Sequence, residues 1–417
     1  MTDRSIAARL ARLRAAGARL RRRSARQTQE ALARVFELWS DASSAPRRAL
    51  ARELPEATGF SAPVVAEGLR LGLREWTGEA FCELARRELG APESLDAAHG
   101  RAVCGFETTA VLLAGSIPMP TLLAIAAPLA LRSPTLAKVA SRDPVTARHV
   151  AHSIAVCDEE LGHCVDWVEF PGDDADRVDA LLAADCVVAS GSDETMSAVA
   201  ARIDPRQRLV AYGHRLSVAV VRGAAEYTAG RLALDVALWD QLGCLSPIAV
   251  YVIDPGRSAA DAFAEALAQS LSDIEARLPR GRVAVDSAAR ISPERASAEL
   301  RASAGARVAV HGAADGTWTV VREDSAATRD APLHRFVRVL PVSDGAALID
   351  ALTPLAPHLA SAGVEGVDAQ LSRALVGLGV SRVCALGTMQ CPPIAWRHDN
   401  RGVLEPLARF PDVDYVA

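Results

Sequence analysis

A cysteine on a short turn is the residue of this chain best suited to covalent chemistry. Cys244 lies in the stretch Gly243-Cys244-Leu245-Ser246-Pro247, after a helix-like segment and before the apolar run 248–253. Such loops often carry reactive residues, because a rigid scaffold aims them at a cleft. Cys244 is therefore either a nucleophile or one more small half-buried residue of a reduced protein. The rest of the sequence bears on that choice.

A second unusual residue is Lys138, the only lysine among 46 basic residues. An ammonium group differs from a guanidinium in size, hydration and geometry, so a lone lysine suggests a position with a specific need. Chance survival in an arginine-biased composition is the alternative.

The eight cysteines do not form a metal-binding pattern. No CxxC pair occurs, and the nearest approach is Cys157, His163 and Cys164, at an expected helix end before a strand. Core packing is the favoured interpretation there, so no metal site is predicted. Scattered cysteines are typical of a reducing compartment, which indicates a cytoplasmic protein.

Length and charge set wider limits. With 417 residues the chain is expected to form two domains, and a net charge of −5 with a pI of about 6.0 does not point to nucleic acid. Residues 1–53 hold 13 arginines against 5 acidic residues. A solvated helical face is favoured there over contact with a membrane, nucleic acid or an acidic partner. No apolar run is long enough for a signal peptide or a membrane span.

The pattern of elements predicts an α/β protein with a helical amino-terminal segment. Strand–helix alternation begins near residue 103 and is typical of a doubly wound parallel sheet, in which ligands bind at the carboxyl ends of the strands. Strands are predicted at 111–115, 135–139, 165–170, 186–189, 208–212, 218–221, 248–253, 306–311, 317–322, 335–341 and 382–386. Helices are predicted in 3–40, 43–53, 64–90, 121–131, 143–158, 173–183, 193–203, 223–238, 258–277, 344–355, 366–378 and 403–409.

One strand-to-helix turn has the character of an anion site. Gly191 and Ser192 end a strand just before a helix, and the free N–H groups of such a turn can meet a phosphate. There is no GxGxxG motif, so the common dinucleotide fingerprint is absent.

Six stretches, taken in order, resemble the aldehyde dehydrogenase superfamily. The resemblance is to its acyl-CoA reductase branch, typified by the fatty acid reductase subunit of bacterial luminescence, and covers about residues 43–410. The most specific match is 235–247, which ends in Gly-Cys-Leu-Ser-Pro. The supporting matches are Gly-Ser-Ile-Pro at 115–118, Lys138 before Arg-Asp-Pro at 142–144, Ser-Gly-Ser at 190–192, Tyr-Gly-His-Arg-Leu-Ser at 212–217 and Trp-Arg-His-Asp at 396–399.

The resemblance implies a two-step reaction at Cys244. Its thiolate would attack an acyl thioester, and a nicotinamide cofactor would then deliver hydride to the acyl-cysteine, releasing an aldehyde. The superfamily commonly uses an Asn to stabilise the oxyanion; Ser116 stands at that position here. His398, next to Asp399, is a candidate acid–base residue, with charged loop packing as the alternative. His214 and Arg215 are candidates for binding a thioester or CoA phosphate, with a structural hydrogen bond as the alternative.

A departure from the superfamily pattern indicates the direction of the reaction. Members that make acids carry a water-activating Glu at the position held here by Ala211. Without that carboxylate, hydrolysis of the acyl-enzyme should be slow, which favours thioester reduction.

The cofactor-side residues favour NADPH over NADH. The resemblance implies that Lys138 contacts the adenosine ribose, and that Gly191 and Ser192 lie near the pyrophosphate. Where NAD-preferring members often have Glu, this chain has Ser141 followed by Arg142, a change that suits a 2′-phosphate.

The expected organisation is an aldehyde-dehydrogenase-like fold of two α/β domains. It consists of an amino-terminal helical segment (1–100), a Rossmann-like NADP-binding domain (101–213), a catalytic domain with the nucleophilic cysteine (214–395) and a return segment (396–417). The expected substrate is acyl-CoA or an acyl carrier protein thioester, and a homo-oligomer or a place in a reductase complex is expected. Asp235 and Asp240 are expected to cap and solvate a helix. The alternatives are an acyltransferase or thioesterase that uses Cys244 without a cofactor, and a non-catalytic scaffold subunit.

Overall fold

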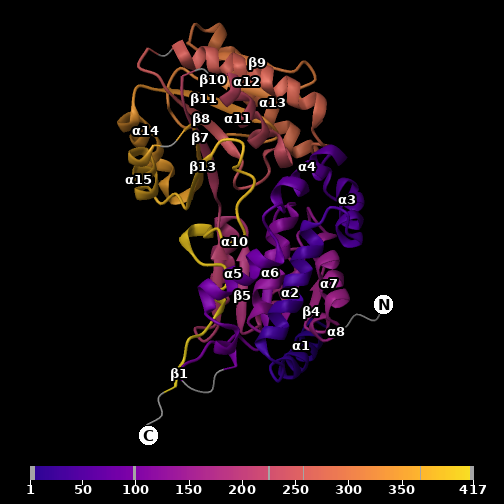
Figure 1. Cartoon of the computed structure of the whole chain (residues 1–417). Coiled ribbons are helices and arrows are strands. Elements are labelled where there is room, and N and C mark those ends of the chain that lie inside the picture. The colour runs from indigo at the N-terminus through magenta and orange to yellow at the C-terminus, as the bar shows by residue number, and fades with distance from the viewer. Residues whose placement is uncertain (1–4, 97–99, 224–225, 257, 367, 414–417) are drawn as a thin grey trace. The chain divides into compact units, whose positions relative to one another are not determined.

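The computed structural model describes residues 5–96, 100–223, 226–256, 258–366 and 368–413. The chain divides into two compact units (Figure 1). The first consists of residues 1–58, 72–214 and 393–417, and the second of residues 59–71 and 215–392. Within the described residues, no helix combines the length and the apolar character needed to cross a membrane.

A five-stranded parallel sheet forms the core of the first unit. Its neighbouring strands all run the same way, so their carboxyl ends share one edge. In sheet order the strands are β4 (Val165–Val168), β3 (Thr135–Lys138), β2 (Thr109–Leu112), β5 (Cys186–Ser190) and β6 (Arg208–Tyr212). A separate antiparallel pair joins β1 (Gly100–Arg101) to β14 (Asp412–Val413).

Helices cover both faces of this sheet. On one face, apolar residues of three helices pack with the strands in a single core cluster; these helices are α1 (Ile6–Leu20), α9 (Ala175–Leu182) and α10 (Asp193–Ala200). Contacts with β2, β3 and β4 are also made by α6 (Pro118–Ala130) and α7 (Thr146–Cys157). The remaining helices of the unit are α2 (Ala25–Ser40), α3 (Ala45–Thr58), α5 (Gly78–Leu89) and α8 (Glu159–Gly162), with short 3₁₀ turns η1 (Pro92–Leu95), η4 (His398–Asn400) and η5 (Glu405–Leu407).

A seven-stranded sheet forms the core of the second unit. Every neighbouring pair is parallel except the last, which is an antiparallel pair as the hairpin-like pattern predicts. In sheet order the strands are β13 (Arg382–Ala385), β12 (Leu359–Val364), β7 (Leu216–Arg222), β8 (Pro247–Ile253), β11 (Phe336–Val342), β10 (Thr319–Arg322) and β9 (Ala309–Gly312).

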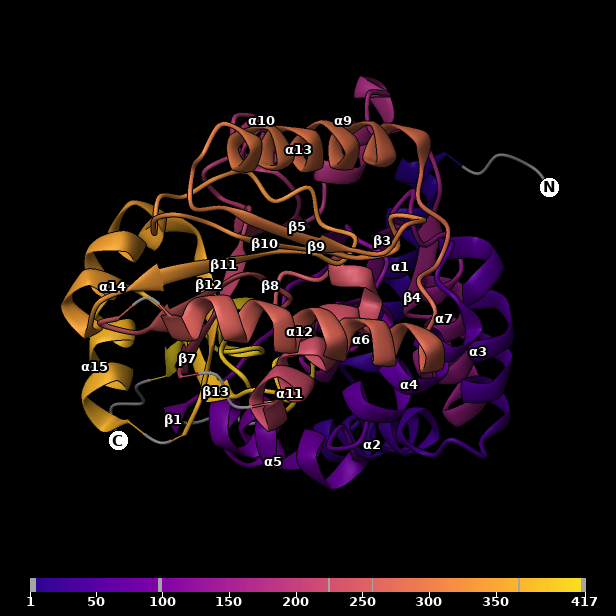
Figure 2. The same cartoon turned by 90° about the horizontal axis from the view of Figure 1, so that it is seen from above.

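Helices also cover both faces of the second sheet. Figure 2 shows α12 (Ser258–Arg277) and α13 (Val285–Ser303) on opposite sides of β10, which both contact. The other helices are α4 (Ala62–Gly72), α11 (Glu226–Ala237), α14 (Gly345–Leu352) and α15 (Ala369–Gly377), with 3₁₀ segments η2 (Leu238–Gln241) and η3 (Thr353–His358). Helices α14 and α15 bury leucines against β7, β8, β11 and β12.

Most predicted elements are present, but helix α13 and strand β12 are among those that were not predicted. Helix α13 buries little more than Ser287 and Ala298, so its sequence has no wide apolar stripe. Strand β12 is wholly buried, yet its sequence LASAGV has low strand propensity. Small residues are needed there, because a Cβ on Gly363 would lie 2.4 Å from the Met389 sulfur. The predicted helices 3–40 and 64–90 are each two helices, and Pro118 begins α6 instead of lying in a turn.

Several amino-terminal arginines contact the first unit's own carboxylates. Arg9 and Arg12 both pair with the buried Asp166, and Arg23 pairs with Asp158 at 2.6 Å. These pairs tie α1 and the following turn to the strand edge and helix end nearby. The positive excess of residues 1–53 is therefore partly neutralised within the fold.

Candidate functional site

Cys244 lies on a turn between η2 and β8, as the sequence predicts. Its residue is exposed, whereas Leu245, Ser246 and Pro247 are buried. Its carbonyl accepts a 2.7 Å hydrogen bond from the Ser217 hydroxyl. The backbone of Cys244 is therefore anchored to the start of β7.

The three residues of η2 nearest this turn have an unusual backbone. Trp239, Asp240 and Gln241 have φ values of 53°, 48° and 64°, in the left-handed region that non-glycine residues rarely adopt. Each such residue costs on the order of 1–3 kcal/mol, so the surroundings must hold the segment. The Trp239 ring is fully buried, lies edge-on to Phe60 at 5.3 Å and packs where Gly68 has no Cβ.

The Gln241 side chain joins this segment to two strands. Its amide nitrogen donates to the carbonyls of Pro247 and Phe336 at 2.8 and 3.0 Å, and its amide oxygen accepts the Phe336 N–H at 3.0 Å. The start of β8, and with it the end of the cysteine turn, is therefore fixed to β11.

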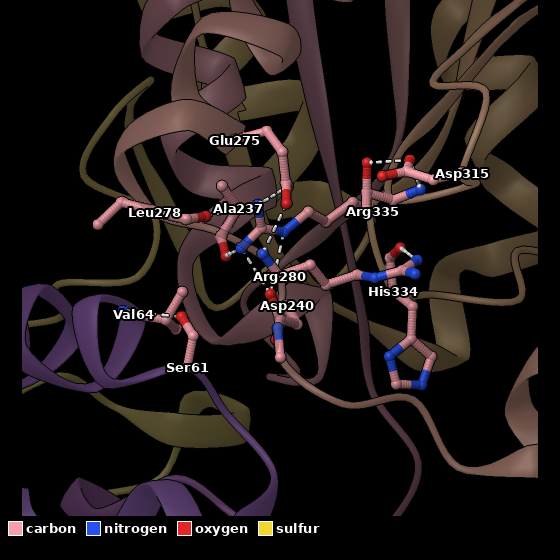
Figure 3. A network of polar contacts seen from close by, with 12 residues as sticks. Ser61, Val64, Ala237, Asp240, Glu275, Leu278, Arg280, Asp315, His334 and Arg335 are labelled. Carbon is pink, nitrogen blue, oxygen red and sulfur yellow. Dashed lines mark hydrogen bonds and ion pairs between the residues drawn. The ribbon is translucent and has the colours of Figure 1, made fainter.

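A buried ion pair holds Asp240 (Figure 3). The fully buried Arg335 donates from Nε and Nη2 to Asp240 Oδ1 at 2.9 and 2.6 Å, and from Nη1 to Glu275 at 2.6 Å. Its remaining contacts are the carbonyls of Ala237 and Leu278, and Asp240 Oδ2 accepts the Gly281 N–H at 2.9 Å. The prediction that Asp240 caps and solvates a helix is wrong, because the carboxylate is buried and paired.

Asp235 is also buried rather than solvated. Its carboxylate accepts the N–H groups of Gly387 and Met389 at 2.5 and 2.9 Å. Burial raises the pKa of Asp235 to about 7 and outweighs these hydrogen bonds, which lower it. Gln390 continues the chain of contacts by donating to the Ser246 hydroxyl at 2.6 Å. A second buried polar network therefore supports the cysteine turn.

Three cofactor-side candidates lie together in the first unit. Lys138 ends β3, and its ammonium lies 5.2 Å from the centre of the Phe170 ring. Desolvation lowers the pKa of Lys138, and the nearby Glu169 opposes this effect. Ser141 and Arg142 are exposed at the tip of a tight turn closed by the Ala140–Asp143 bridge.

The turn after β5 differs in part from the expected anion site. Gly191 does not offer its N–H, which donates to the Tyr212 carbonyl at 3.1 Å. The Ser192 hydroxyl caps α10 by accepting the Thr195 N–H at 3.3 Å. Hydrogen bonding from Ser192 also lowers the pKa of Glu194. Ser192 therefore positions the start of α10 at the carboxyl edge of the sheet.

The remaining catalytic candidates also lie in the first unit. Ser116 is buried in the turn between β2 and α6, at the same carboxyl edge. The His398 ring stacks on Tyr212 at 4.8 Å and lies 4.9 Å from Trp396. The His398 Nε2 to Asp399 Oδ1 distance is 3.9 Å, too long for a hydrogen bond. The imidazole is thus packed against two aromatic rings, with the Asp399 carboxylate beside it.

Ala211 and His214 lie at and just after the carboxyl end of β6. Ala211 carries no carboxylate, and its carbonyl accepts from Arg401 at 3.1 Å. The His214 N–H donates to Asp193 at 2.8 Å, so this residue has the structural contact given as an alternative. None of the eight cysteines forms a disulfide, and no group of metal-ligating side chains occurs in the described part of the chain.

Sequence reasoning missed the residues that support the cysteine. Arg335, Glu275 and Gln390 act far from Cys244 along the chain, and nothing in their local sequence marks them. The one available signal was the presence of two arginines, Arg335 and Arg338, in the predicted strand 335–341, since buried strands rarely hold charge without partners.

Several solved structures with a similar fold are aldehyde dehydrogenases. A methylmalonate-semialdehyde dehydrogenase from Oceanimonas doudoroffii matches 98% of this chain and 89% of its own, with a TM-score of 0.77 and 15% identity. A NAD-dependent benzaldehyde dehydrogenase from Corynebacterium glutamicum covers the same shares with a TM-score of 0.74 and 17% identity. At these identities the likeness shows the fold, which is that of the aldehyde dehydrogenases with two α/β units.

Sequence comparison is more specific. A long-chain acyl-protein thioester reductase from Aliivibrio fischeri is 23% identical over 390 residues, covering 90% of this chain and 79% of the relative. A protein of the same name from Photobacterium phosphoreum is 22% identical over 392 residues, with 90% and 78% covered. The model of the acyl-CoA reductase (LuxC) family matches residues 21–410. The chain therefore belongs to the acyl-CoA reductase (LuxC) family.

Proposed function

We propose that this chain reduces an acyl thioester to an aldehyde through an acyl-Cys244 intermediate, with NADPH as the hydride source. The observation that carries the proposal is the exposed Cys244 on a turn whose backbone is fixed by buried polar contacts, in a chain of this family. The two relatives named as long-chain acyl-protein thioester reductases support the same substrate class.

In the first step the Cys244 thiolate attacks the thioester carbonyl. The carbon–sulfur bond to the carrier breaks, the carrier thiolate leaves and takes a proton, and the acyl group remains on Cys244. After reduction, the tetrahedral adduct on Cys244 collapses: its oxygen re-forms the carbonyl, and the thiolate leaves. Thiolate suits both steps, because it is a good nucleophile and a good leaving group.

The absence of a water-activating carboxylate protects the acyl-enzyme. Ala211 stands where acid-forming relatives place that base, and the Ala211 carbonyl already accepts from Arg401. Hydrolysis of acyl-Cys244 would therefore lack general-base help.

The residues at the carboxyl edge of the first unit's sheet suit a phosphorylated nicotinamide cofactor. When bound, that cofactor would supply the hydride. Lys138 would meet the adenosine ribose, and the exposed Ser141 and Arg142 would meet a 2′-phosphate where NAD-preferring members often place a Glu. Ser192 would lie near the pyrophosphate with Gly191, although the Gly191 N–H is already used.

The remaining assignments concern the oxyanion, proton transfer, location and assembly. We assign Ser116 as a donor to the developing oxyanion and His398 as an acid–base residue; both stay predictions. We also propose a cytoplasmic location, because all eight cysteines are thiols in the structure, as a reducing compartment would keep them. A homo-oligomer or a place in a reductase complex stays a prediction.

The test is NADPH oxidation with acyl-CoA substrates of varied chain length. We expect Cys244→Ala to reduce the rate by at least about 10⁴-fold, because no other nucleophile replaces the thiol. Cys82→Ala is the control, since burial raises the pKa of that half-buried thiol and it has no role in the proposal.

Mass spectrometry of the enzyme with acyl-CoA and no NADPH should show one acyl group, lost in Cys244→Ala. Unchanged NADPH oxidation in Cys244→Ala would end the proposed mechanism. Thiol release without NADPH use would instead indicate an acyltransferase or thioesterase.

A further inference from the structure

A groove in the first unit is lined by arginines that the proposed chemistry does not use. It has a volume of about 750 Å³, within the range of small-molecule sites. Its walls come from the beginning of β6 and from the return segment 397–411, with Cys104. Four arginines, Arg208, Arg397, Arg401 and Arg409, line it, against one carboxylate, Glu405.

These four arginines form no ion pair within the described part of the chain. Arg401 and Arg409 donate to the carbonyls of Ala211 and Gly105 at 3.1 and 2.8 Å, which orients them without neutralising them. The guanidinium groups of Arg208 and Arg409 lie 5.9 and 5.1 Å from the centre of the Phe106 ring. The groove is thus a fixed concentration of positive charge.

A neighbouring hollow of the same unit shows the opposite arrangement. It has a volume of about 670 Å³ and shares Arg409 with the first groove, but its other two arginines, Arg202 and Arg206, lie among three aspartates. There Arg202 pairs with Asp179 at 3.3 Å and Arg206 with Asp204 at 2.9 Å. Arginine-rich composition alone therefore does not explain the uncompensated charge of the first groove.

The groove follows the edge strand of the sheet toward the residues of the proposed reaction. Arg208 begins β6, and Arg401 contacts Ala211 near its carboxyl end. η5 of the return segment packs on β6, and His398 of the same segment stacks on Tyr212. Arg401 therefore links the groove to the carboxyl half of the strand, the end at which ligands of parallel sheets bind.

Guanidinium groups bind phosphate oxygens through paired hydrogen bonds, and several of them suit a ligand with more than one phosphate charge. We propose that this groove binds the phosphate groups of the thioester's phosphopantetheine carrier. The inference rests on the proposed thioester reduction. The shared chemistry is a phosphate ester on pantetheine, present in coenzyme A and on the arm of a carrier protein.

The test compares three thioesters of one acyl group: acyl-CoA, acyl carrier protein and phosphate-free acyl-pantetheine. For Arg208→Gln/Arg397→Gln, we expect the ratio of kcat/KM for acyl-CoA to kcat/KM for acyl-pantetheine to fall about ten-fold, through a higher KM. The wild-type ratio should also fall with added salt, and the variant's ratio should fall less. The matched control is Arg202→Gln/Arg206→Gln, which removes two arginines from the balanced hollow and should leave the ratio unchanged.

Binding is measured separately, so that the inference does not depend on turnover. Calorimetry with free coenzyme A, in saturating NADP⁺ to fill the cofactor site, should show binding that weakens about ten-fold in Arg208→Gln/Arg397→Gln. If wild-type protein reduces none of the thioesters but binds coenzyme A in this way, the proposed function fails and the groove assignment stands.

The outcomes separate the sources. If Arg208→Gln/Arg397→Gln lowers kcat/KM for acyl-CoA alone, the groove binds coenzyme A. If it lowers kcat/KM for both acyl-CoA and acyl carrier protein, the groove binds the phosphate common to both. A loss with acyl carrier protein alone overturns the inference in favour of an acidic protein surface. Equal loss with all three thioesters, or no loss, also overturns it.

Discussion

The turn that carries Cys244 and the strand end that carries Lys138 hold their side chains in different ways. The cysteine turn is fixed by buried side chains of its own segment and of distant ones, among them Gln241, Arg335 and Gln390. The Ser141–Arg142 turn is exposed and closed by one backbone bridge. A nucleophile must keep one orientation through two covalent steps, whereas a phosphate contact tolerates adjustment. Rigid support is thus concentrated around the proposed nucleophile.

Breaking the support of the cysteine turn should have the largest effect. Arg335→Met leaves the buried Asp240 and the partly exposed Glu275 without their cation, so we expect a loss of about 3–5 kcal/mol in unfolding free energy. Alkylation of Cys244 by iodoacetamide should change in rate as well. The control is Arg86→Met, which breaks an exposed pair with Glu83 and should cost less than about 1 kcal/mol.

If Arg335→Met does not fold, Arg335→Lys keeps the charge but not the forked contact, and kcat should fall more than KM rises. Equal stability of the Arg335→Met and Arg86→Met variants would show that the buried ion pair contributes no more to folding than the exposed one.

The second network should make stability depend on pH. The folded pKa of Asp235, about 7, lies above its unfolded value of about 4, so the folded state binds the extra proton between these values. Stability from this group is therefore greatest at low pH and falls as pH rises toward 7, by up to about 4 kcal/mol.

Chemical denaturation from pH 5 to 8 should show this fall in the wild type and not in Asp235→Asn, whose amide carries no charge. Asp344→Asn is a matched comparison, because hydrogen bonds lower the pKa of that exposed helix cap and its contribution is lost only in acid. An identical pH dependence in wild type and Asp235→Asn would contradict the assignment.

Changing the exposed turn should alter specificity and leave stability intact. We expect Arg142→Ala to lower the ratio of kcat/KM for NADPH to kcat/KM for NADH about ten-fold, with less than about 0.5 kcal/mol change in unfolding free energy. Arg148→Ala, which breaks an exposed pair with Glu53, should not change the cofactor ratio. An unaltered ratio in Arg142→Ala would separate this turn from the 2′-phosphate.

The smallest effect is expected at the amino terminus. Arg22 and Arg52 are exposed and lie outside the groove and the cofactor turn. Arg22→Gln/Arg52→Gln should change NADPH oxidation with acyl-CoA or acyl carrier protein by less than about two-fold, because solvent screens isolated surface charges. A large loss confined to the carrier-protein substrate would place a docking surface there after all.

The local sequence pattern was sufficient to predict most helices and strands and the turn that carries Cys244. Alternating apolar runs and helical periods predicted both sheets, and Gly243 and Pro247 marked the turn that exposes Cys244. The six ordered motifs were sufficient for the family. Strand β12 and helix α13 were not predicted, because their faces consist of small or polar residues and the periodicity of apolar residues is weak.

The sequence by itself determined which side chain could react and which strand end carries the lone lysine, because both depend on residue type and short-range order. Only the tertiary structure decided that Asp235 and Asp240 are buried, and that Arg335, 95 residues away from Asp240, neutralises it. It also decided which arginines are neutralised and which line a groove. Ion pairing depends on distances in space, and a sequence of arginines does not state where their partners will lie.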